Sequence, residues 1–173
     1  MTISFAMACY EAGLLTKEDT DGLELRFGNE EVIIPVIEAI ARRQPGLGEL
    51  LADGSAAAAA KIGRGAEQFL LTVKRQEIPM HDPRVKTGLG LQFALAPQGA
   101  DHWWAQHDPF FATETSPGTV ELAPMGLSQP ISPLDLGPDK VRMVVYTSYL
   151  VALYDNLGVC IFTAVARSMT PLD

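Results

Sequence analysis

Apolar residues fill most of the first fifteen positions, and nearly all of them are good helix formers. The stretch 3–15 therefore predicts a mostly buried helix. A second pattern begins after Asn29, a residue type that can cap a helix over 30–43. Pro35 lies inside this pattern and should kink or delay the helix, because proline lacks the backbone donor of a helix interior. The apolar face of this segment is formed by Ile33, Ile37 and Ile40.

Two more helices are indicated between residues 55 and 96. Ser55 precedes a run of alanines, which predicts a capped helix up to Gly63. Residues 69–73 fit either a strand or more helix, because a short apolar run does not separate the two. Residues 88–96 are apolar despite their glycines and predict a buried helix.

The last third of the chain combines a proline-rich stretch with a long apolar segment. Residues 113–138 hold five of the twelve prolines and little charge, which predicts a long loop with at most one helical turn. The stretch 141–157 predicts a helix that ends at Gly158, followed by a second helical piece. We therefore expect an all-α, multihelical fold, with one helical subdomain over 1–112 joined by the loop to a shorter one over 139–173.

Composition places the chain among globular proteins and excludes several classes. Of its 173 residues 47% are hydrophobic and 20% are charged, with a net charge of −8. An acidic chain does not fit a nucleic-acid surface or an anionic membrane, both of which attract clustered Lys and Arg. We find no apolar run of membrane-spanning length and no basic segment of a signal peptide at the start. Two cysteines form no disulfide framework, so we expect a reducing, cytoplasmic setting.

Two turns share the pattern Asp-x-x-Gly followed by an apolar residue. The first contains Asp19 and Gly22, and the second contains Asp155 and Gly158. About one such match arises by chance in a chain of this length, and the common interpretation is a helix cap or Asx-turn. The same geometry also suits a flat heterocycle such as a pterin or guanine, because a carboxylate accepts from adjacent N–H donors and glycine lets the backbone approach. The pattern alone leaves both interpretations open.

Cysteine and histidine supply the other candidates for chemistry. Cys160, just beyond the second turn, could donate a thiolate to iron or zinc, although a lone cysteine in an apolar stretch is more often part of the core. Histidine is the usual proton carrier near neutral pH, and the chain has three, His81, His102 and His107. A sharp turn at Gly99 could present His102, or the ring could merely cap a helix. The sequence lacks a dinucleotide fingerprint, a phosphate loop, paired zinc-binding histidines and a nucleophile elbow.

Four segments in order resemble the tungsten-containing aldehyde ferredoxin oxidoreductase family, and the resemblance covers nearly the whole chain. They read TISFAMACYEAGLLTKEDTDGLELRFGNEE, IARRQPGLGELLADG, VKRQEIPMHDPRVKTGLGLQFALAPQGADH and YDNLGVCIFT. The first and last are similar to the two pterin-binding motifs of that family, and the third is similar to its Arg-Gly-x-x-His segment. The resemblance implies the helical fold of the family's C-terminal domains.

The resemblance also implies roles for particular residues. Asp19 and Asp155 would accept hydrogen bonds from two pterin rings that share one tungsten or molybdenum. His102 would donate a proton or orient the substrate, and Cys160 would be the fourth thiolate of a [4Fe–4S] cluster. The backbone of the two turns would approach the rings at the remaining motif positions: Gly22, Leu23, Glu24, Gly158 and Val159.

The chain also departs from the family pattern. Val159 stands in place of Leu and Glu24 in place of Asp, which are mild changes. Gln98 in place of Arg and Trp104 in place of a basic residue bear on the substrate class and on contacts to cofactor phosphate. The family's N-terminal pterin domain and its other three cluster cysteines are not in this sequence. We therefore expect the helical middle of a larger oxidoreductase.

The resemblance defines an expected reaction and its partners. The parent enzyme should oxidise a small aldehyde to a carboxylate and pass electrons to ferredoxin, and the isolated chain should be inactive. The expected partners are ferredoxin and the rest of the parent polypeptide, and a homodimer remains open. Two alternatives stay beside this reading: a family relative that acts on a hydroxyacid or an aromatic acyl substrate, and a helical scaffold without chemistry.

Overall fold

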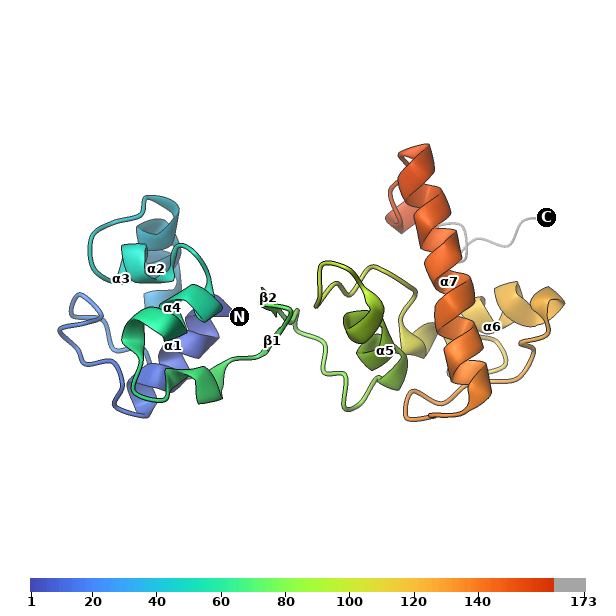
Figure 1. Ribbon diagram of the computed structural model, residues 1–173, viewed down its shortest axis with the longest axis horizontal. Helices are drawn as coiled ribbons and strands as arrows, with labels where there is room; N and C mark the ends of the chain where they lie inside the picture. Colours follow the sequence, from blue (N-terminus) through green and yellow to red (C-terminus); the bar gives the residue numbers. More distant parts are fainter. Residues whose placement is uncertain (164–173) are drawn as a thin grey trace. The chain divides into compact units, whose positions relative to one another are not determined.

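The computed structural model describes residues 1–163 and divides the chain into two compact units, Met1–Ile78 and Pro79–Asp173. Figure 1 labels the helices and strands of both units. The expected division at 113–138 differs from this contact pattern, in which the chain separates between residues 78 and 79. No helix within residues 1–163 combines the length and the apolar character that a membrane span needs.

The first unit is built from four α-helices and a very short hairpin. A 3₁₀ turn precedes α2 and another follows α4, at Glu30–Val32 and Ala66–Phe69. The antiparallel hairpin pairs Thr72 with Glu77. The α-helices and strands are α1 Thr2–Glu11, α2 Ile33–Ala41, α3 Leu47–Leu51, α4 Ser55–Ile62, β1 Thr72–Val73 and β2 Gln76–Glu77.

The start of α2 shows what Asn29 and Pro35 do. Pro35 lies in the first turn of α2, where its missing donor costs no helical hydrogen bond, and the chain makes a 3₁₀ turn before this helix begins. The proline thus delays the helix, as expected. Asn29 occupies the N-cap position ahead of Glu30, as expected, but its side chain makes no capping bond there and instead donates to the carbonyl of Glu24 at 2.9 Å. The buried face of α2 carries Val36, whereas Ile37 is exposed.

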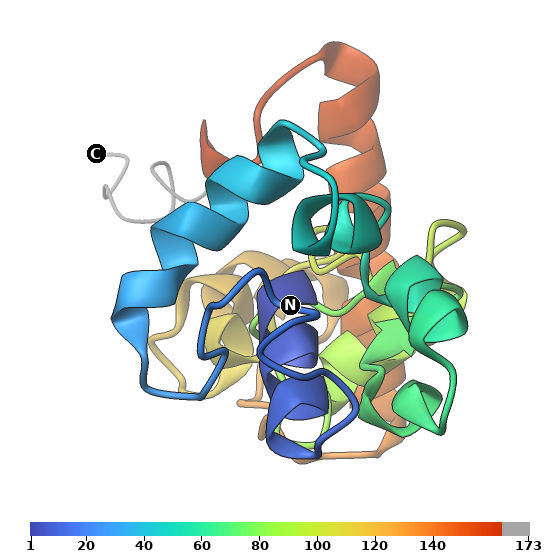
Figure 2. The ribbon, with the colours of Figure 1, turned by 90° about the vertical axis from the view of Figure 1, so that its left-hand side faces the viewer.

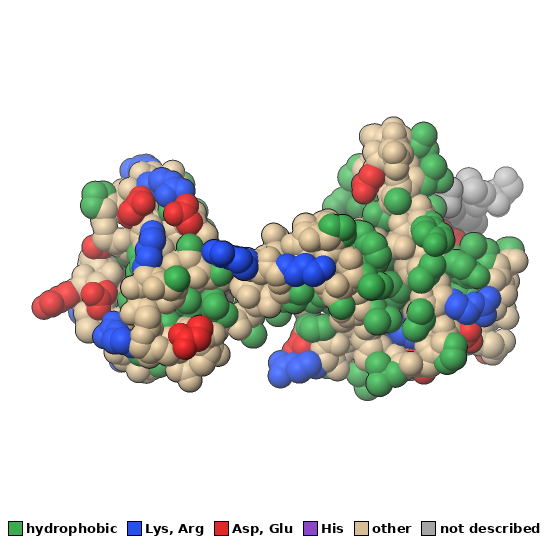
Figure 3. Space-filling model, in the orientation of Figure 1, with side chains coloured by type: hydrophobic (Ala, Val, Ile, Leu, Met, Phe, Trp, Pro, Cys, Tyr) green, Lys and Arg blue, Asp and Glu red, His purple; other side chains and the backbone are tan. Residues whose placement is uncertain are grey.

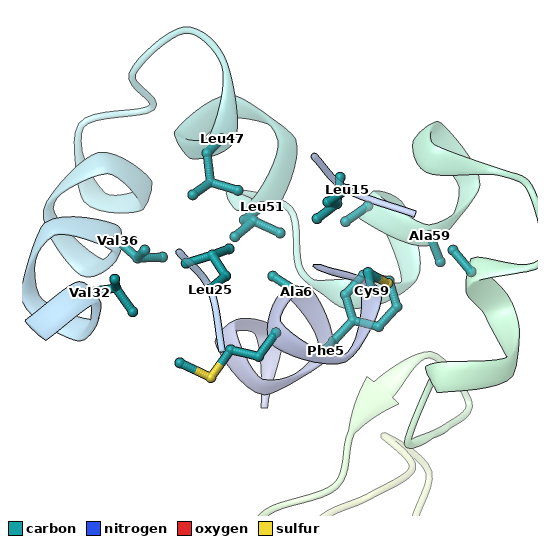
Figure 4. Packing of buried hydrophobic residues seen from close by; sticks show 13 residues of the cluster. Phe5, Ala6, Cys9, Leu15, Leu25, Val32, Val36, Leu47, Leu51 and Ala59 are labelled. Carbon is teal, nitrogen blue, oxygen red and sulfur yellow. The ribbon is translucent and has the colours of Figure 1, made fainter. Parts of the chain in front are cut away.

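The core of the first unit forms where α1 meets α3 and α4 beneath the loop that follows α1. Figure 4 shows Leu25 of this loop close to Leu47 and Leu51 of α3, and all three side chains are buried. Figures 1 and 2 both show α3 beside α2. The two helices approach so closely at Gly48 that a Cβ built there would lie 2.4 Å from the carbonyl oxygen of Ala39.

Glu77 fastens the hairpin of the first unit to α1 and α4. Its carboxylate accepts from the hydroxyl of Thr2 at 2.7 Å and from the backbone N–H of Ser55 at 2.7 Å. Ser55 is therefore not the cap that the sequence predicted, since Gly54 occupies the N-cap position and Glu77 supplies the acceptor. Burial pushes the pKa of Glu77 upward, but the bonds from Ser55 and Thr2 outweigh it and hold the pKa below its usual value.

The second unit packs the long helix α7 against α5. Its core includes Phe111, Met143 and Val144. The predicted loop over 113–138 contains one short helix and a 3₁₀ turn, each with a proline near its start, where a missing N–H costs little. The elements are α5 Thr87–Leu95, a 3₁₀ turn at Asp108–Phe111, α6 Pro117–Leu122, a 3₁₀ turn at Ala123–Met125, and α7 Pro138–Leu157.

A buried ion pair joins three elements of the second unit. Lys140 of α7 donates to Oδ1 of Asp108, and the exposed fractions of the two side chains are 1% and 0%. Asp108 also accepts from the backbone N–H groups of Gly88 at 3.0 Å and Leu89 at 3.1 Å. One carboxylate therefore satisfies two unpaired donors at the start of α5 and neutralises the only charge of α7 that points into the core.

The all-α expectation is confirmed for the described residues, apart from the two-residue strands of the hairpin. The long helix ends at Gly158, as the sequence predicted. Residues 162 and 163 are helical, but most of the second helical piece expected after Gly158 lies outside the described residues.

Candidate functional site

The first Asp-x-x-Gly turn begins with a reciprocal cap between Thr16 and Asp19. Oδ2 of Asp19 accepts from the backbone N–H and from the hydroxyl of Thr16, both at 2.8 Å. The N–H of Asp19 donates back to the Thr16 hydroxyl at 3.3 Å. This is the capping box of a helical turn, and its two bonds from Thr16 lower the pKa of Asp19 below its usual value. The carboxylate is exposed, and its Oδ1 forms no hydrogen bond within residues 1–163.

The turn then closes through Gly22, whose N–H donates to the carbonyl of Lys17 at 2.8 Å. Gly22 has φ +87°, and a Cβ built on it would meet no atom within 4 Å, so its backbone is open to an approaching group. Leu23 packs against the core. Glu24 is exposed and pairs with Lys17 at 3.0 Å, and this pairing lowers the pKa of Glu24.

A cavity of about 370 Å³ lies beside this turn. Asp21 is held in it by the N–H of Leu47, which donates to Oδ2 at 3.0 Å. Arg64 has a left-handed backbone with φ +52° and donates to the carbonyl of Leu14. The cavity thus has carboxylates and cations on its wall, and its lining is Leu15, Glu18, Asp19, Asp21, Gly46, Leu50, Lys61, Ile62 and Arg64.

The sequence indicated Asp19 as a site residue but not the other four charged residues of this cavity: Glu18, Asp21, Lys61 and Arg64. The signal for Asp21 was its position inside the first motif. Arg64 stands between two glycines, a pattern that indicates a turn and nothing about which cavity the turn meets.

The second Asp-x-x-Gly turn is a helix end with different geometry. Gly158 has φ +65°, its N–H donates to the carbonyl of Asp155 at 3.2 Å, and the N–H of Val159 donates to that of Tyr154 at 2.9 Å. These two bonds form a Schellman motif. As at Gly22, a Cβ on Gly158 would meet no atom within 4 Å. The shared sequence pattern therefore produces two open left-handed glycines, but Asp19 starts a turn whereas Asp155 ends a helix.

Asp155 lies at an electrostatically unfavourable place for a carboxylate. It is exposed in the last turn of α7, where the helix dipole favours a cation, and that turn contains no basic residue. Its carboxylate forms no hydrogen bond with any residue of the described part of the chain. Asp155 therefore contributes little to the stability of this unit.

Cys160 follows directly on the surface of the second unit. Its thiol is free and exposed, while its carbonyl accepts from the N–H of Thr163 at 2.9 Å and from the hydroxyl of Thr163 at 2.7 Å. The core interpretation of this cysteine is wrong, whereas Cys9 is buried. Within residues 1–163 no group of three or more His, Cys, Asp or Glu side chains is arranged to hold a metal ion.

The three histidines form a cluster, which the sequence did not predict. The ring centroids of His81 and His102 lie 5.1 Å apart, those of His81 and His107 lie 4.7 Å apart, and those of His102 and His107 lie 5.6 Å apart. The signal in the sequence was weak, because His81 is 21 positions before His102 and lies in a segment of irregular structure. Trp103 joins the group with its ring 5.0 Å from that of His102.

The pKa values of the three imidazoles are all below the ordinary value, first because of burial. For His107 burial lowers the pKa to about 4, although the hydrogen bond to the carbonyl of His102 opposes this. For His102 the nearby Asp101 opposes the effect of burial and Lys86 adds to it. For His81 the charges of Lys86 and of a protonated His102 both add to the effect of burial. Each of the three rings is therefore harder to protonate than a free imidazole.

An aromatic contact connects the cluster to the segment of Cys160. The ring of Phe162, two positions after Cys160, lies 5.1 Å from the ring of Trp103 in an edge-on arrangement. Within the second unit, the structure thus brings His102 into the neighbourhood of the second motif. The first motif, with Asp19, Gly22 and Leu23, belongs to the other unit.

The full length of the chain, residues 1–173, matches a family model described as aldehyde ferredoxin oxidoreductase, domains 2 and 3. A tungsten-containing aldehyde ferredoxin oxidoreductase of Pyrococcus horikoshii is 36% identical over 165 residues, which cover 94% of this chain and 25% of that protein. A tungsten-containing aldehyde ferredoxin oxidoreductase of Pyrococcus furiosus is 33% identical over 163 residues, covering 94% of this chain and 24% of that protein.

A third relative carries a different name. The aliphatic sulfonate oxidoreductase, WOR-like subunit, of Pyrococcus furiosus is 32% identical over 106 residues, which cover 58% of this chain and 17% of that protein. The chain spans about a quarter of the length of the first two relatives.

Proposed function

The chain belongs to the aldehyde ferredoxin oxidoreductase family, and we propose that it forms one part of a family-length protein that oxidises aldehydes to carboxylic acids. In this proposal the reaction takes place at a tungsten (or molybdenum) bis-pterin centre, and a [4Fe–4S] cluster passes single electrons to ferredoxin. The relatives that cover most of the chain are named for tungsten, aldehyde and ferredoxin. The remaining parts of the family chain would supply the rest of the site.

The observation that carries this proposal is the open left-handed glycine beside a carboxylate in both turns. Since no atom lies within 4 Å of a Cβ built on Gly22 or Gly158, a planar ring has room against either backbone. Oδ1 of Asp19 and the carboxylate of Asp155 accept no hydrogen bond from residues 1–163 and could accept from the N–H donors of a pterin. The residues present therefore fit one pterin at each turn.

The proposal assigns a task to each of the predicted site residues. When bound, the metal centre supplies the two-electron oxidation of the aldehyde, with water as the source of oxygen. Asp19 and Asp155 hold and orient the two rings, with Glu24 at the outer end of the first motif. The backbone at Leu23 and Val159 lines the rings. His102 accepts or donates the proton that accompanies the reaction.

Cys160 has the task of an iron ligand. An exposed thiol without a partner among the described residues is free to bind a metal, and Cys160 lies two positions after Gly158 of the proposed second pterin motif. Electrons would then leave the pterin through the neighbouring cluster. The other three thiolates would come from other parts of the family chain.

The exposed apolar side chains of α7 support a place inside a larger protein. Tyr149, Leu153 and Leu157 are spaced by one helical turn and are 69%, 52% and 65% exposed. Figure 3 shows hydrophobic side chains on the face of the unit that contains α7. Because the chain spans about a quarter of its relatives, the remaining parts of the family chain are the expected cover for this stripe.

Among substrates, an aldehyde fits the comparisons better than a sulfonate. The relatives named for aldehydes match 94% of the chain, whereas the relative named for aliphatic sulfonates matches 58%. We therefore propose a small aldehyde as the substrate.

Replacing Cys160 with serine tests the proposed function in a family-length protein that contains this chain. The expected result is loss of the cluster, from about four iron atoms per protein to fewer than one, because a hydroxyl is a poor ligand for this type of cluster. Iron analysis and electron paramagnetic resonance of the reduced protein would measure it. The same substitution should leave the thermal unfolding of the 173-residue chain unchanged, since the thiol is exposed. A full cluster in the Cys160→Ser protein would show that Cys160 is not an iron ligand and would contradict this part of the proposal.

A further inference from the structure

The three rings of the histidine cluster and the adjacent Lys86 make four basic groups. Their hydrogen bonds differ, so they do not accept a proton equally well. We propose that His81, Lys86 and His107 act as positioning residues for His102, so that a proton that enters the cluster resides on His102. The catalytic meaning of this inference rests on the proposed function, in which His102 carries a proton. The order in which the three rings take up a proton is a property of this chain alone.

His107 is fixed as the tautomer with hydrogen on Nε2, and burial disfavours its charged form. Its side chain is buried, and its Nε2 lies 2.7 Å from the carbonyl oxygen of His102, a distance at which the nitrogen must carry the hydrogen. A proton could then enter only at Nδ1, and the resulting cation would lie next to two other imidazoles in a buried position. His107 therefore holds the backbone of His102 in place and does not compete for the proton.

His81 is blocked by the ammonium group of Lys86. Nζ of Lys86 lies 3.2 Å from Nδ1 of His81, and since an ammonium group only donates, Nδ1 must be the acceptor. This contact fixes His81 as the tautomer with hydrogen on Nε2. A proton on Nδ1 of His81 would remove this hydrogen bond. It would also place the imidazolium nitrogen only 3.2 Å from the ammonium nitrogen of Lys86, so that two positive charges would repel each other.

His102 is left as the favoured acceptor. Its ring forms no hydrogen bond with residues 1–163, so both nitrogens are available to a proton or a substrate. It is also the ring whose charged form a carboxylate, Asp101, favours, whereas no carboxylate acts in this way on His81 or His107. Asp101 is held in place by the N–H of Trp103 at 2.8 Å and by the amide of Gln98. The charged and titratable groups around His102 are thus His81, Lys86, Asp101 and His107, with Trp103 as a neutral wall.

Titration of the histidine ring signals by nuclear magnetic resonance, in the 173-residue chain, tests this assignment. We expect His102 to titrate at the highest pH of the three and His107 to titrate last, near pH 4. In the Lys86→Gln variant the midpoint of His81 should move to higher pH, and that of His102 should follow in the same direction. In the Asp101→Asn variant the midpoint of His102 should fall, with a smaller change at His81. The Arg42→Gln variant is the matched control, because it removes one exposed cation that does not act on any of the three rings, and it should move none of the three midpoints.

Either of two results would overturn the inference: His81 or His107 titrating above His102, or unchanged midpoints of His81 and His102 in a folded Lys86→Gln protein. Near-ultraviolet circular dichroism shows whether each variant keeps the packing of Trp103 and Trp104. The test needs no cofactor or turnover. If the titration order holds while a family-length His102→Gln enzyme stays fully active, the proposed function of His102 fails and the order of protonation does not.

Discussion

Replacing Lys140 with methionine is expected to lower the free energy of unfolding of the unit that contains α7 by about 3–5 kcal/mol, the range for breaking a buried ion pair. The substitution keeps most of the side-chain volume but leaves the carboxylate of Asp108 buried without a counter-ion. The hydrogen bonds that the N–H groups of Gly88 and Leu89 donate to Asp108 remain and reduce the loss of stability. Both tryptophans lie in this unit, so urea unfolding followed by tryptophan fluorescence reports on it.

Two further proteins separate the ion pair from general effects of substitution. Asp139→Asn breaks an exposed pair with Arg142 on the same helix and should change the free energy of unfolding by less than about 1 kcal/mol. The double variant Asp108→Asn with Lys140→Met removes both charges and should recover part of the loss, because no unpaired charge is then buried. A Lys140→Met protein as stable as the wild type would contradict the buried pairing.

Replacing Gly48 with alanine is expected to destabilise the first unit by about 1–3 kcal/mol or more, because overpacking a close helix contact forces the backbone to move. The added Cβ would lie 2.4 Å from the carbonyl oxygen and 2.8 Å from the carbonyl carbon of Ala39. Both are backbone atoms, so no flexible side chain can yield. Hydrogen exchange of the amides of α1 to α4 would measure the change in this unit.

Gly90 in α5 offers the matched control for Gly48. Both glycines lie in helices with ordinary backbone angles, but a Cβ on Gly90 would have its nearest contact at 3.6 Å, on Pro83. There alanine should stabilise the helix by about 0.5–1 kcal/mol through its higher helix propensity. Equal effects of the two substitutions on stability would show that the contact between α2 and α3 does not require glycine at position 48.

The helices could be predicted from the sequence because each depends on a local pattern. The apolar run ahead of Gly158 and the alanines after Ser55 correspond to α7 and α4. Pro35 was correctly expected to delay α2, since its effect is fixed by its own ring. The caps were not predictable in the same way. The acceptors at α4 and α5 come from Glu77 and Asp108, which lie about twenty positions away, and only the tertiary fold brings them there.

The sequence could name candidate site residues, but it could not give their geometry. The two motifs share a pattern, yet Asp19 belongs to a capping box while Asp155 ends a helix. Turn chemistry depends on the residues before the motif, such as Thr16, and not on Asp and Gly alone. The histidine cluster and the cavity beside Asp21 arise from residues distant in sequence. Their formation follows from the packing of each unit.

In the proposed function the two acidic turns hold a pterin-bound metal, and tungsten analysis of an Asp155→Asn variant of the family-length protein measures whether the second turn takes part. Asp155 suits this test because its removal should not weaken the fold: it is exposed and lies at the wrong end of the helix dipole. Asp139→Asn at the start of the same helix is the control. We expect the Asp155→Asn protein to lose most of its tungsten and the Asp139→Asn protein to retain it. Full tungsten content in the Asp155→Asn protein would show that the second turn does not hold the cofactor.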